Sequence, residues 1–190
     1  MSRSVRQQIV ISGVGGQGII FITRLLAEAA IANRLSVFTS ETHGMAQRGG
    51  TVISHIKVGD FSSPLIRPFT ADAMLALKAE GIVQHGFYLK PDSWAVVNSP
   101  KHITPEFNGS VLTVDADGMA QKIKDPKSVN LILLGFALAV VSKRYESPFF
   151  CSLEDIKTVL ENQMVDKEKW LNASLTAIET GYNFRLKTKF

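Results

Sequence analysis

Two segments of this sequence combine glycine with polar side chains in patterns that suit ligand binding. The first is the run Gly13-Val14-Gly15-Gly16-Gln17-Gly18, a literal G-x-G-x-x-G motif. Glycine lets the backbone turn tightly and approach a phosphate, and a helix that begins after the motif adds free N–H groups and a partial positive charge. The second segment runs from Glu41 to Gly50. The candidate binding residues of both segments are Gly13, Gly15, Gly16, Gln17, Gly18, Glu41, His43, Gln47, Arg48, Gly49 and Gly50.

The elements around the glycine run are those that a nucleotide motif needs. Residues Gln8 to Ser12 predict a short apolar strand, and Ile19 to about Ala32 predict a helix that stops at Asn33. Glu41 follows a second predicted strand, Leu35 to Thr39, roughly where a ribose-binding acid would lie. A dinucleotide site is therefore one interpretation, and a helix that simply packs closely on a sheet is another. Because no Lys-Ser/Thr pair follows the motif, the run does not predict nucleotide triphosphate hydrolysis.

The rest of the chain alternates strands with helices. A polar loop is expected over 40–50 and an irregular segment over 62–68. Further strands are expected at 51–58, 73–77, 95–98 and 111–115. Helices are expected at 81–88, 118–124 and 129–143, after Ser152 and Asp155, whose spacing is a close relative of the capping box, and along the stripe Leu171, Leu175, Ile178 and Tyr182. This order predicts a single α/β domain over 1–190: a three-layer sandwich with a mostly parallel, Rossmann-like sheet and helices on both faces.

Composition narrows the class of protein. Of the 21 basic residues, Arg3, Arg6, Arg185, Lys187 and Lys189 lie near the termini, which leaves 16 against 17 acidic residues in the body of the chain. That near-neutral body argues against nucleic-acid binding. Because Cys151 is the one cysteine, no iron–sulfur cluster or internal disulfide is expected, and no metal site is predicted. The longest apolar run, Val129 to Val141, is too short for a membrane span, so we expect a cytoplasmic protein.

The order of several short motifs resembles a known family. After the glycine run come Glu41-Thr42-His43-Gly44-Met45-Ala46-Gln47-Arg48-Gly49-Gly50 and Val52-Ile53-Ser54-His55. This order is similar to the gamma-type domain of 2-oxoacid:ferredoxin oxidoreductases. The stretch 43–50 and the later Ser63-Pro64-Leu65-Ile66 look most like the small (beta) subunit of the indolepyruvate branch. The resemblance continues through Ala71-Asp72-Ala73, a Lys90-Pro91 turn before a strand, Asn130 to Gly135 and Asn172-Ala173, and so covers nearly the whole chain.

The resemblance implies an accessory subunit that is inactive alone. In that family a 2-oxo acid, here an aryl pyruvate such as indolepyruvate, is oxidatively decarboxylated to acyl-CoA, with electrons passed to ferredoxin. Thiamine diphosphate, Mg²⁺ and the iron–sulfur clusters are expected on a partner subunit, with none in this chain, and coenzyme A is the cosubstrate. The loops at 13–18 and 41–50 should be neighbours, with Arg48 placed to bind a carboxylate or phosphate. In isolation the chain is a candidate homodimer.

Other interpretations stay open at this point. The chain is alternatively a stand-alone NAD(P)- or flavin-binding protein, or a regulatory module that binds a small anion. Arg48 is alternatively paired with Glu41, and His43 and His55 are more typical of hydrogen-bonded structural histidines than of a metal or acid–base site. Cys151 is expected in the core. The aromatic residues Trp170 and Phe149-Phe150 are either core residues or contacts for a partner, and the apolar helix at 129–141 is either central to the fold or covered by another chain.

Overall fold

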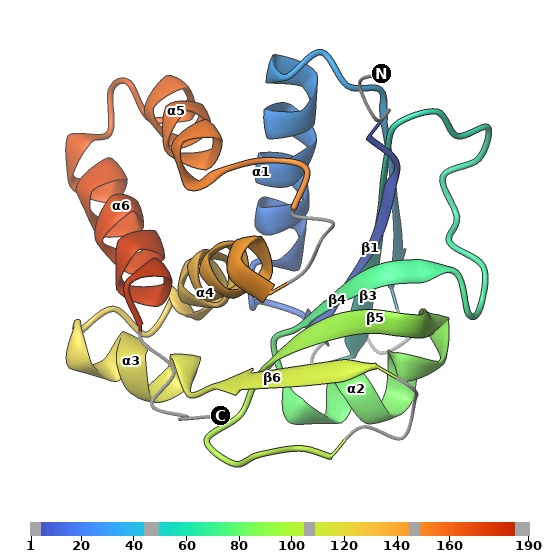
Figure 1. Cartoon of the computed structure of the whole chain (residues 1–190). Coiled ribbons are helices and arrows are strands. Elements are labelled where there is room, and N and C mark those ends of the chain that lie inside the picture. Colours follow the sequence, from blue (N-terminus) through green and yellow to red (C-terminus); the bar gives the residue numbers. More distant parts are fainter. Residues whose placement is uncertain (1–4, 44–49, 105–108, 145–148, 185–190) are drawn as a thin grey trace.

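A six-stranded sheet with helices on both faces forms the centre of the computed structural model, which describes residues 5–43, 50–104, 109–144 and 149–184 (Figure 1). The described strands are β1 (Gln7–Val14), β2 (Val37–His43), β3 (Thr51–Val58), β4 (Ala71–Ala76), β5 (Leu89–Asn98) and β6 (Ser110–Val114). The described helices are α1 (Ile19–Ala32), α2 (Ala79–His85), α3 (Ala116–Lys122), α4 (Val129–Arg144), α5 (Leu153–Gln163) and α6 (Glu168–Tyr182), with a short 3₁₀ helix, η1, at Gly86–Tyr88.

The sheet is mostly parallel, as the sequence predicts. Its strand order is β2-β3-β1-β4-β5-β6, and β1, β4, β5 and β6 pair in parallel. Strand β3 is antiparallel to both of its neighbours, β1 and β2. Since β2 and β1 are both antiparallel to β3, they run in the same direction but are not adjacent.

The two faces of the sheet are covered unequally. Helices α1, α4, α5 and α6 lie on one side, and α2 lies on the other (Figure 1). Side chains of β1 alternate between these layers: Ile9 and Ile11 pack toward α1 and α4, whereas Val10 packs toward α2. The thinner layer is completed by the segment 59–70, from which Ile66 is buried in the same hydrophobic cluster as Val10 and Met74.

Helix α4 is central to the fold and needs no second chain to cover it. Its residues from Leu131 to Val141 are buried, and it packs on α1, α3, α6, β4 and β5. A Cβ at Gly135 would lie 2.0 Å from the Ile178 carbonyl oxygen, and a Cβ at Gly181 would lie 1.9 Å from the Ile132 carbonyl oxygen. These reciprocal approaches show that α4 and α6 cross backbone to backbone, which only glycine permits.

Most predicted elements occur within a few residues of their expected bounds, and the differences have local causes. Strand β2 extends through residues 40–43, which were expected in a loop, because they complete a ladder with β3. The expected turn at Lys90-Pro91 is instead an irregularity inside β5, where Ala71 pairs with Leu89 but Ala73 pairs with Trp94. The extra residues are accommodated there by Asp92, which has a left-handed φ of 62°.

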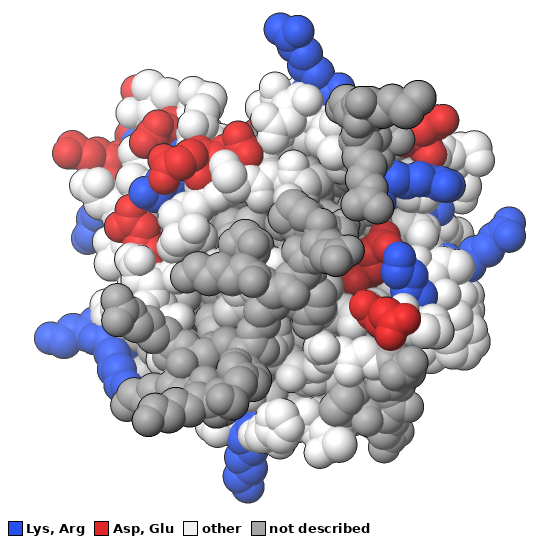
Figure 2. Space-filling model, in the orientation of Figure 1, with Lys and Arg blue, Asp and Glu red and all other residues white. Residues whose placement is uncertain are grey.

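The visible surface carries its charges in a pattern unlike that of a nucleic-acid-binding protein. Acidic side chains gather over α5 and α6, and further acidic side chains lie beside Lys and Arg on the right of the view, while other Lys and Arg side chains project singly from the rim (Figure 2). Within the described part of the chain, no helix is both long and apolar enough to span a bilayer.

Candidate functional site

The glycine run lies where open α/β sheets bind ligands. The chain leaves β1 for α1 on one face of the sheet and leaves the adjacent β4 for α2 on the other face. The carboxyl ends of β1 and β4 therefore form the switch point of this sheet, the usual place for a binding crevice. Leu77, which follows β4, is tied to β1 because its N–H donates to the Ser12 carbonyl at 2.8 Å.

The loop at this switch point is braced from inside by Gln17. The Gln17 Oε1 atom accepts a hydrogen bond from Val14 N at 2.9 Å, and its Nε2 donates to the Leu77 carbonyl at 3.4 Å. The N–H of Gln17 donates to the Val14 carbonyl at 3.2 Å, and the N–H of Gly15 donates to the Gly50 carbonyl, also at 3.2 Å. Three N–H groups that could point at a phosphate thus already have partners within the chain.

The glycines of the motif have different reasons to be glycine. A Cβ at Gly13 would lie 2.7 Å from Gln17 Oε1, so this residue serves internal packing. Gly18 has a left-handed φ of 76°, and a Cβ there would lie 2.1 Å from Asn130 Nδ2 of α4. Gly16 has a left-handed φ of 93°, which the turn requires. Gly15 has no left-handed φ, and a Cβ there would meet no atom within 4 Å, so no described neighbour requires glycine at this position.

Polar side chains that the sequence did not single out complete this edge. Asn98, at the end of β5, is 4% exposed, donates to the Leu77 carbonyl at 3.1 Å and accepts from Ala116 N at 3.0 Å. It also donates to Asp117 at 3.0 Å, and Asp117 forms a half-exposed ion pair with Lys78 at 3.7 Å. A polar residue directly after the apolar run 95–97 was the available signal for Asn98.

The second predicted segment reaches the same edge only in part. Gly50 contacts the glycine loop through the hydrogen bond from Gly15, so the expected proximity is confirmed at that residue. His43 is paired with Val52, which pairs in turn with Gly13. Gln47, Arg48 and Gly49 lie outside the described residues, as does the side chain of His43.

The position of Glu41 does not match that of a ribose-binding acid. Glu41 lies in β2 opposite Ser54, and Ser54 lies opposite Ile11 of β1. Because β3 separates the two strands, the backbone of Glu41 is about 10 Å from β1, twice the spacing of neighbouring strands. Together with the internal bracing by Gln17, this geometry argues against the dinucleotide interpretation.

The described histidines of the thinner layer are structural. His55 is 2% exposed, and its Nδ1 accepts a hydrogen bond from Ile66 N at 3.0 Å, which identifies the neutral tautomer with its proton on Nε2. Burial lowers the pKa of His55, and the charge of Lys57 lowers it further. His85 lies 2.8 Å from the Ser12 hydroxyl, and burial lowers its pKa as well. The prediction that His55 is a hydrogen-bonded strand histidine is confirmed.

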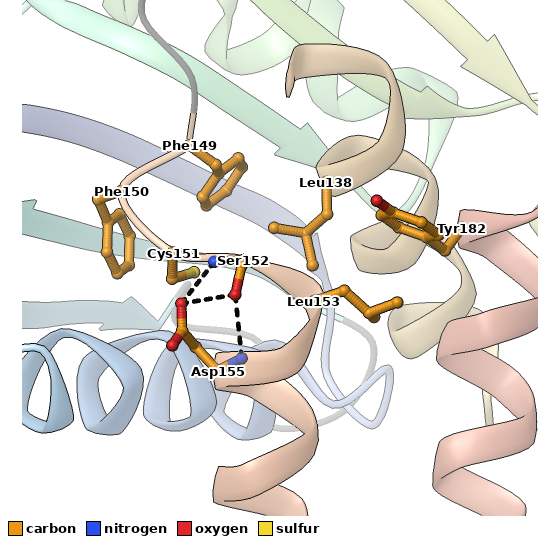
Figure 3. Close-up of a pocket in the computed structure, with 8 residues that line it drawn as sticks. All are labelled: Leu138, Phe149, Phe150, Cys151, Ser152, Leu153, Asp155 and Tyr182. Carbon is orange, nitrogen blue, oxygen red and sulfur yellow. Dashed lines mark hydrogen bonds between the residues drawn. The ribbon is translucent and has the colours of Figure 1, made fainter. Parts of the chain in front are cut away.

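A cavity of about 280 Å³ between α4, α5 and α6 holds the one cysteine but no reactive thiol (Figure 3). Cys151 is 7% exposed, and burial raises its pKa, as does the charge of Asp155. Ser152 and Asp155 form the predicted capping box at the start of α5: Ser152 N donates to Asp155 Oδ2 at 2.7 Å, and Asp155 N donates to Ser152 Oγ at 3.2 Å. Phe149 packs in the core beside Trp94, so this aromatic residue is not a partner contact.

The chemistry of the described residues suits binding and packing. No cluster of three or more His, Cys, Asp or Glu side chains that could hold a metal occurs in the described ranges. A single cysteine also cannot supply the four thiolates that an iron–sulfur cluster normally needs. At the switch-point edge, the amides of Gln17 and Asn98 brace the loops from inside, and the half-exposed Lys78–Asp117 pair lies at the surface.

The sequence is similar to a known protein family and to individual known proteins. The family model described as "Pyruvate ferredoxin/flavodoxin oxidoreductase" matches residues 8–184. Indolepyruvate oxidoreductase subunit IorB of Archaeoglobus fulgidus is 31% identical, over 94% of this chain and 95% of that protein. The subunit of the same name from Methanothermobacter thermautotrophicus is 29% identical, over 83% of this chain and 90% of that protein.

Solved structures share the fold. The 2-oxoglutarate:ferredoxin oxidoreductase of Magnetococcus marinus, solved with 2-oxoglutarate, coenzyme A and succinyl-CoA bound, superposes with a TM-score of 0.76 at 25% identity. That match covers 95% of this chain but spans 31% of the longer one. Pyruvate oxidoreductase subunit PORC of Thermotoga maritima superposes with a TM-score of 0.73 at 24% identity, over 95% of this chain and 96% of that one.

Proposed function

Because this chain belongs to the pyruvate ferredoxin/flavodoxin oxidoreductase family, we propose that it is an accessory subunit of a 2-oxoacid:ferredoxin oxidoreductase and has no activity alone. The observation that carries the proposal is the end-to-end match with a protein that is itself a subunit, at 31% identity over 95% of its length. We propose a single domain over the chain, and thiamine diphosphate, Mg²⁺ and iron–sulfur clusters on the partner. Those groups would supply the decarboxylation and the electron transfer to ferredoxin.

The role of this chain would be to pack against the partner and present its switch-point edge to the reaction. Gly15 supports this role, because no described atom lies within 4 Å of the position of a Cβ there, which leaves room among the described residues for a ligand or a partner backbone to approach closely. The neighbouring 41–50 segment would add Arg48, whose planar guanidinium suits the carboxylate of a 2-oxo acid or a phosphate of coenzyme A. The braced loop would hold this surface rigid.

A second surface fits contact with the partner. Trp170 of α6 is 63% exposed and lines a cavity of about 360 Å³ together with Phe21, Met164 and Lys167. A large exposed indole beside apolar neighbours is typical of an interface anchor. We propose that the subunit that binds thiamine diphosphate covers this face.

Indolepyruvate, or another aryl pyruvate, is the substrate that we propose. Support comes from the two IorB relatives, whose names carry indolepyruvate. The products would be the acyl-CoA, CO₂, one proton from the thiol of coenzyme A, and two electrons passed to ferredoxin.

The test is a substrate panel on the complex reconstituted from this chain and its co-purified partner under anaerobic conditions. Indolepyruvate, phenylpyruvate, pyruvate, 2-oxoglutarate and 2-oxoisovalerate would each be assayed for CoA-dependent reduction of methyl viologen. The highest kcat/KM is expected with the aryl pyruvates, and the separate chain should reduce no dye. Preference for pyruvate or 2-oxoglutarate would overturn the substrate proposal, whereas dye reduction by the chain alone would overturn the accessory role.

A further inference from the structure

A basic pocket lies at the edge of the sheet opposite the glycine loop. It has a volume of about 450 Å³ and is formed by the start of β1, the end of β3 and the segment 59–70. Gln7 pairs with Val58 at this edge, whereas the glycine loop follows Val14 at the other end of the same strand. The length of β1, roughly 23 Å, therefore separates the pocket from the switch-point site.

Three cations converge on the pocket without a counterion from the described residues. Arg6, Lys57 and Arg67 line it, and none of them forms a salt bridge with a residue in the described ranges. Asp60 is the acidic residue among the lining side chains, so three positive charges face one negative charge. The pocket therefore has an excess of two positive charges and attracts an anion.

Lys57 contributes a partly buried charge to this excess. The residue as a whole is 8% exposed and the hydrogen bond of its ammonium group is partly buried, so its charge is screened less by water than that of a fully exposed lysine. Its ammonium group donates to the Leu65 carbonyl at 2.8 Å, which uses one of its three hydrogen-bond donors. Burial lowers the pKa of Lys57, and the charges of Arg67 and Arg6 lower it further. The three cations are therefore close enough to repel one another.

The pocket is also held in shape by contacts from β3. The Phe61 ring contacts two of the cations, with its centroid 4.5 Å from the Arg6 guanidinium carbon and 4.9 Å from the Lys57 ammonium. The segment that closes the pocket is attached to β3 by the hydrogen bonds from Ile66 N to His55 and from Lys57 to Leu65. These bonds fix the position of the Ser63-Pro64-Leu65-Ile66 motif, which is not part of the switch-point site.

We propose that this pocket binds the phosphate group of a small metabolite, between Lys57 and Arg67. A phosphate dianion would match the excess of two positive charges, and its oxygens would accept from the free donors of Lys57, from the Arg67 guanidinium, and from the hydroxyls of Ser62 and Ser63 that line the same pocket. A carboxylate would neutralise half of that excess. The site is separate from the proposed reaction edge and does not depend on the accessory-subunit proposal.

Isothermal titration calorimetry of the full chain with inorganic phosphate, at constant ionic strength and pH 7.5, tests this site. Saturable binding with one phosphate per chain is expected. Arg67→Met should weaken it at least tenfold, and Asp60→Asn should strengthen it severalfold because it removes the negative charge from the lining. Both side chains are exposed, so neither change should disturb the fold. Arg24→Met, which removes an exposed arginine from α1, is the control for a general loss of positive charge and should leave the affinity within twofold.

Acetate is the comparison anion in the same experiment. It should bind at least tenfold more weakly than phosphate, and equal affinity would overturn the assignment to phosphate. The absence of saturable phosphate binding, or an affinity that neither Arg67→Met nor Asp60→Asn changes, would overturn the site itself.

Discussion

The residues of the glycine loop divide into those that the fold requires and one that it does not. Gly13 and Gly18 are confined by Gln17 and Asn130, whereas a Cβ at Gly15 would meet no described atom within 4 Å. In a dinucleotide site the middle glycine of G-x-G-x-x-G is the one that lets the backbone approach a pyrophosphate. In this chain Gly15 also permits a close approach, but several N–H groups of its loop already have hydrogen-bond partners within the chain. This arrangement fits contact with a partner or substrate better than binding of a cofactor by this chain alone.

Alanine substitutions at Gly18 and Gly15 should separate these roles. Gly18→Ala combines a left-handed φ with a Cβ 2.1 Å from Asn130 Nδ2, so it should lower the free energy of unfolding by about 1–3 kcal/mol. Gly15→Ala should change the stability by less than about 0.5 kcal/mol. Urea unfolding of both variants measures this, and the assembled complex with Gly15→Ala should lose activity. Equal destabilisation by the two substitutions would contradict the division.

The buried histidines make the stability of the chain sensitive to acid. Burial lowers the pKa of His85 in the folded protein, so the unfolded chain takes up the proton first as the pH falls through about 6.5. The stabilisation is therefore complete above that pH and declines below it, with a slope of at most about 1.4 kcal/mol per pH unit for each histidine. His85→Asn should reduce the slope between pH 7 and pH 5 in chemical unfolding. An unchanged slope in His85→Asn would show that this residue is not the source.

At the scale of elements, the sequence predicted those helices and strands whose bounds depend on residues close together in the chain. Helix α1 and strand β3 have the predicted bounds, and the box at Ser152 and Asp155 begins α5 as expected. The insertion of β3 between β1 and β2 was not predictable, because strand pairing depends on residues far apart in the sequence. The Asn98 network and the basic pocket were not predictable for the same reason. Arg6, Lys57 and Arg67 are far apart in the sequence and come together only through the pairing of strands in the sheet.

The capping box gives a test of stability at this scale. Ser152→Ala removes the acceptor for Asp155 N and should lower the free energy of unfolding by about 1 kcal/mol. Thr158→Ala, an exposed change in the same helix, serves as the control and should stay within about 0.5 kcal/mol.

Although burial raises the pKa of Asp155, hydrogen bonds from Ser152 and Asn33 hold it below its ordinary value. The contribution of Asp155 should thus be present at neutral pH and be lost as the pH falls below about 3.9.

At the scale of the whole molecule, the exposed indole of Trp170 is the feature that points to assembly. Trp170→Ala should weaken binding of the partner subunit at least tenfold without changing the thermal midpoint of the chain, because the side chain is mostly outside the core. Ile31→Ala is a matched control: Ile31 is also 63% exposed but does not line the same cavity. Analytical ultracentrifugation of the mixed subunits would measure the loss. Equal effects of both substitutions would remove Trp170 from the interface.

The central claim, that this chain works as an accessory subunit, is tested most directly by affinity capture of the tagged chain from its native extract under anaerobic conditions. Mass spectrometry should identify a co-purifying subunit with thiamine diphosphate and iron–sulfur clusters, and the eluate should reduce methyl viologen when a 2-oxo acid and coenzyme A are added. If the chain is instead recovered alone, inactive toward 2-oxo acids and with a dinucleotide tightly bound, the accessory-subunit account is wrong.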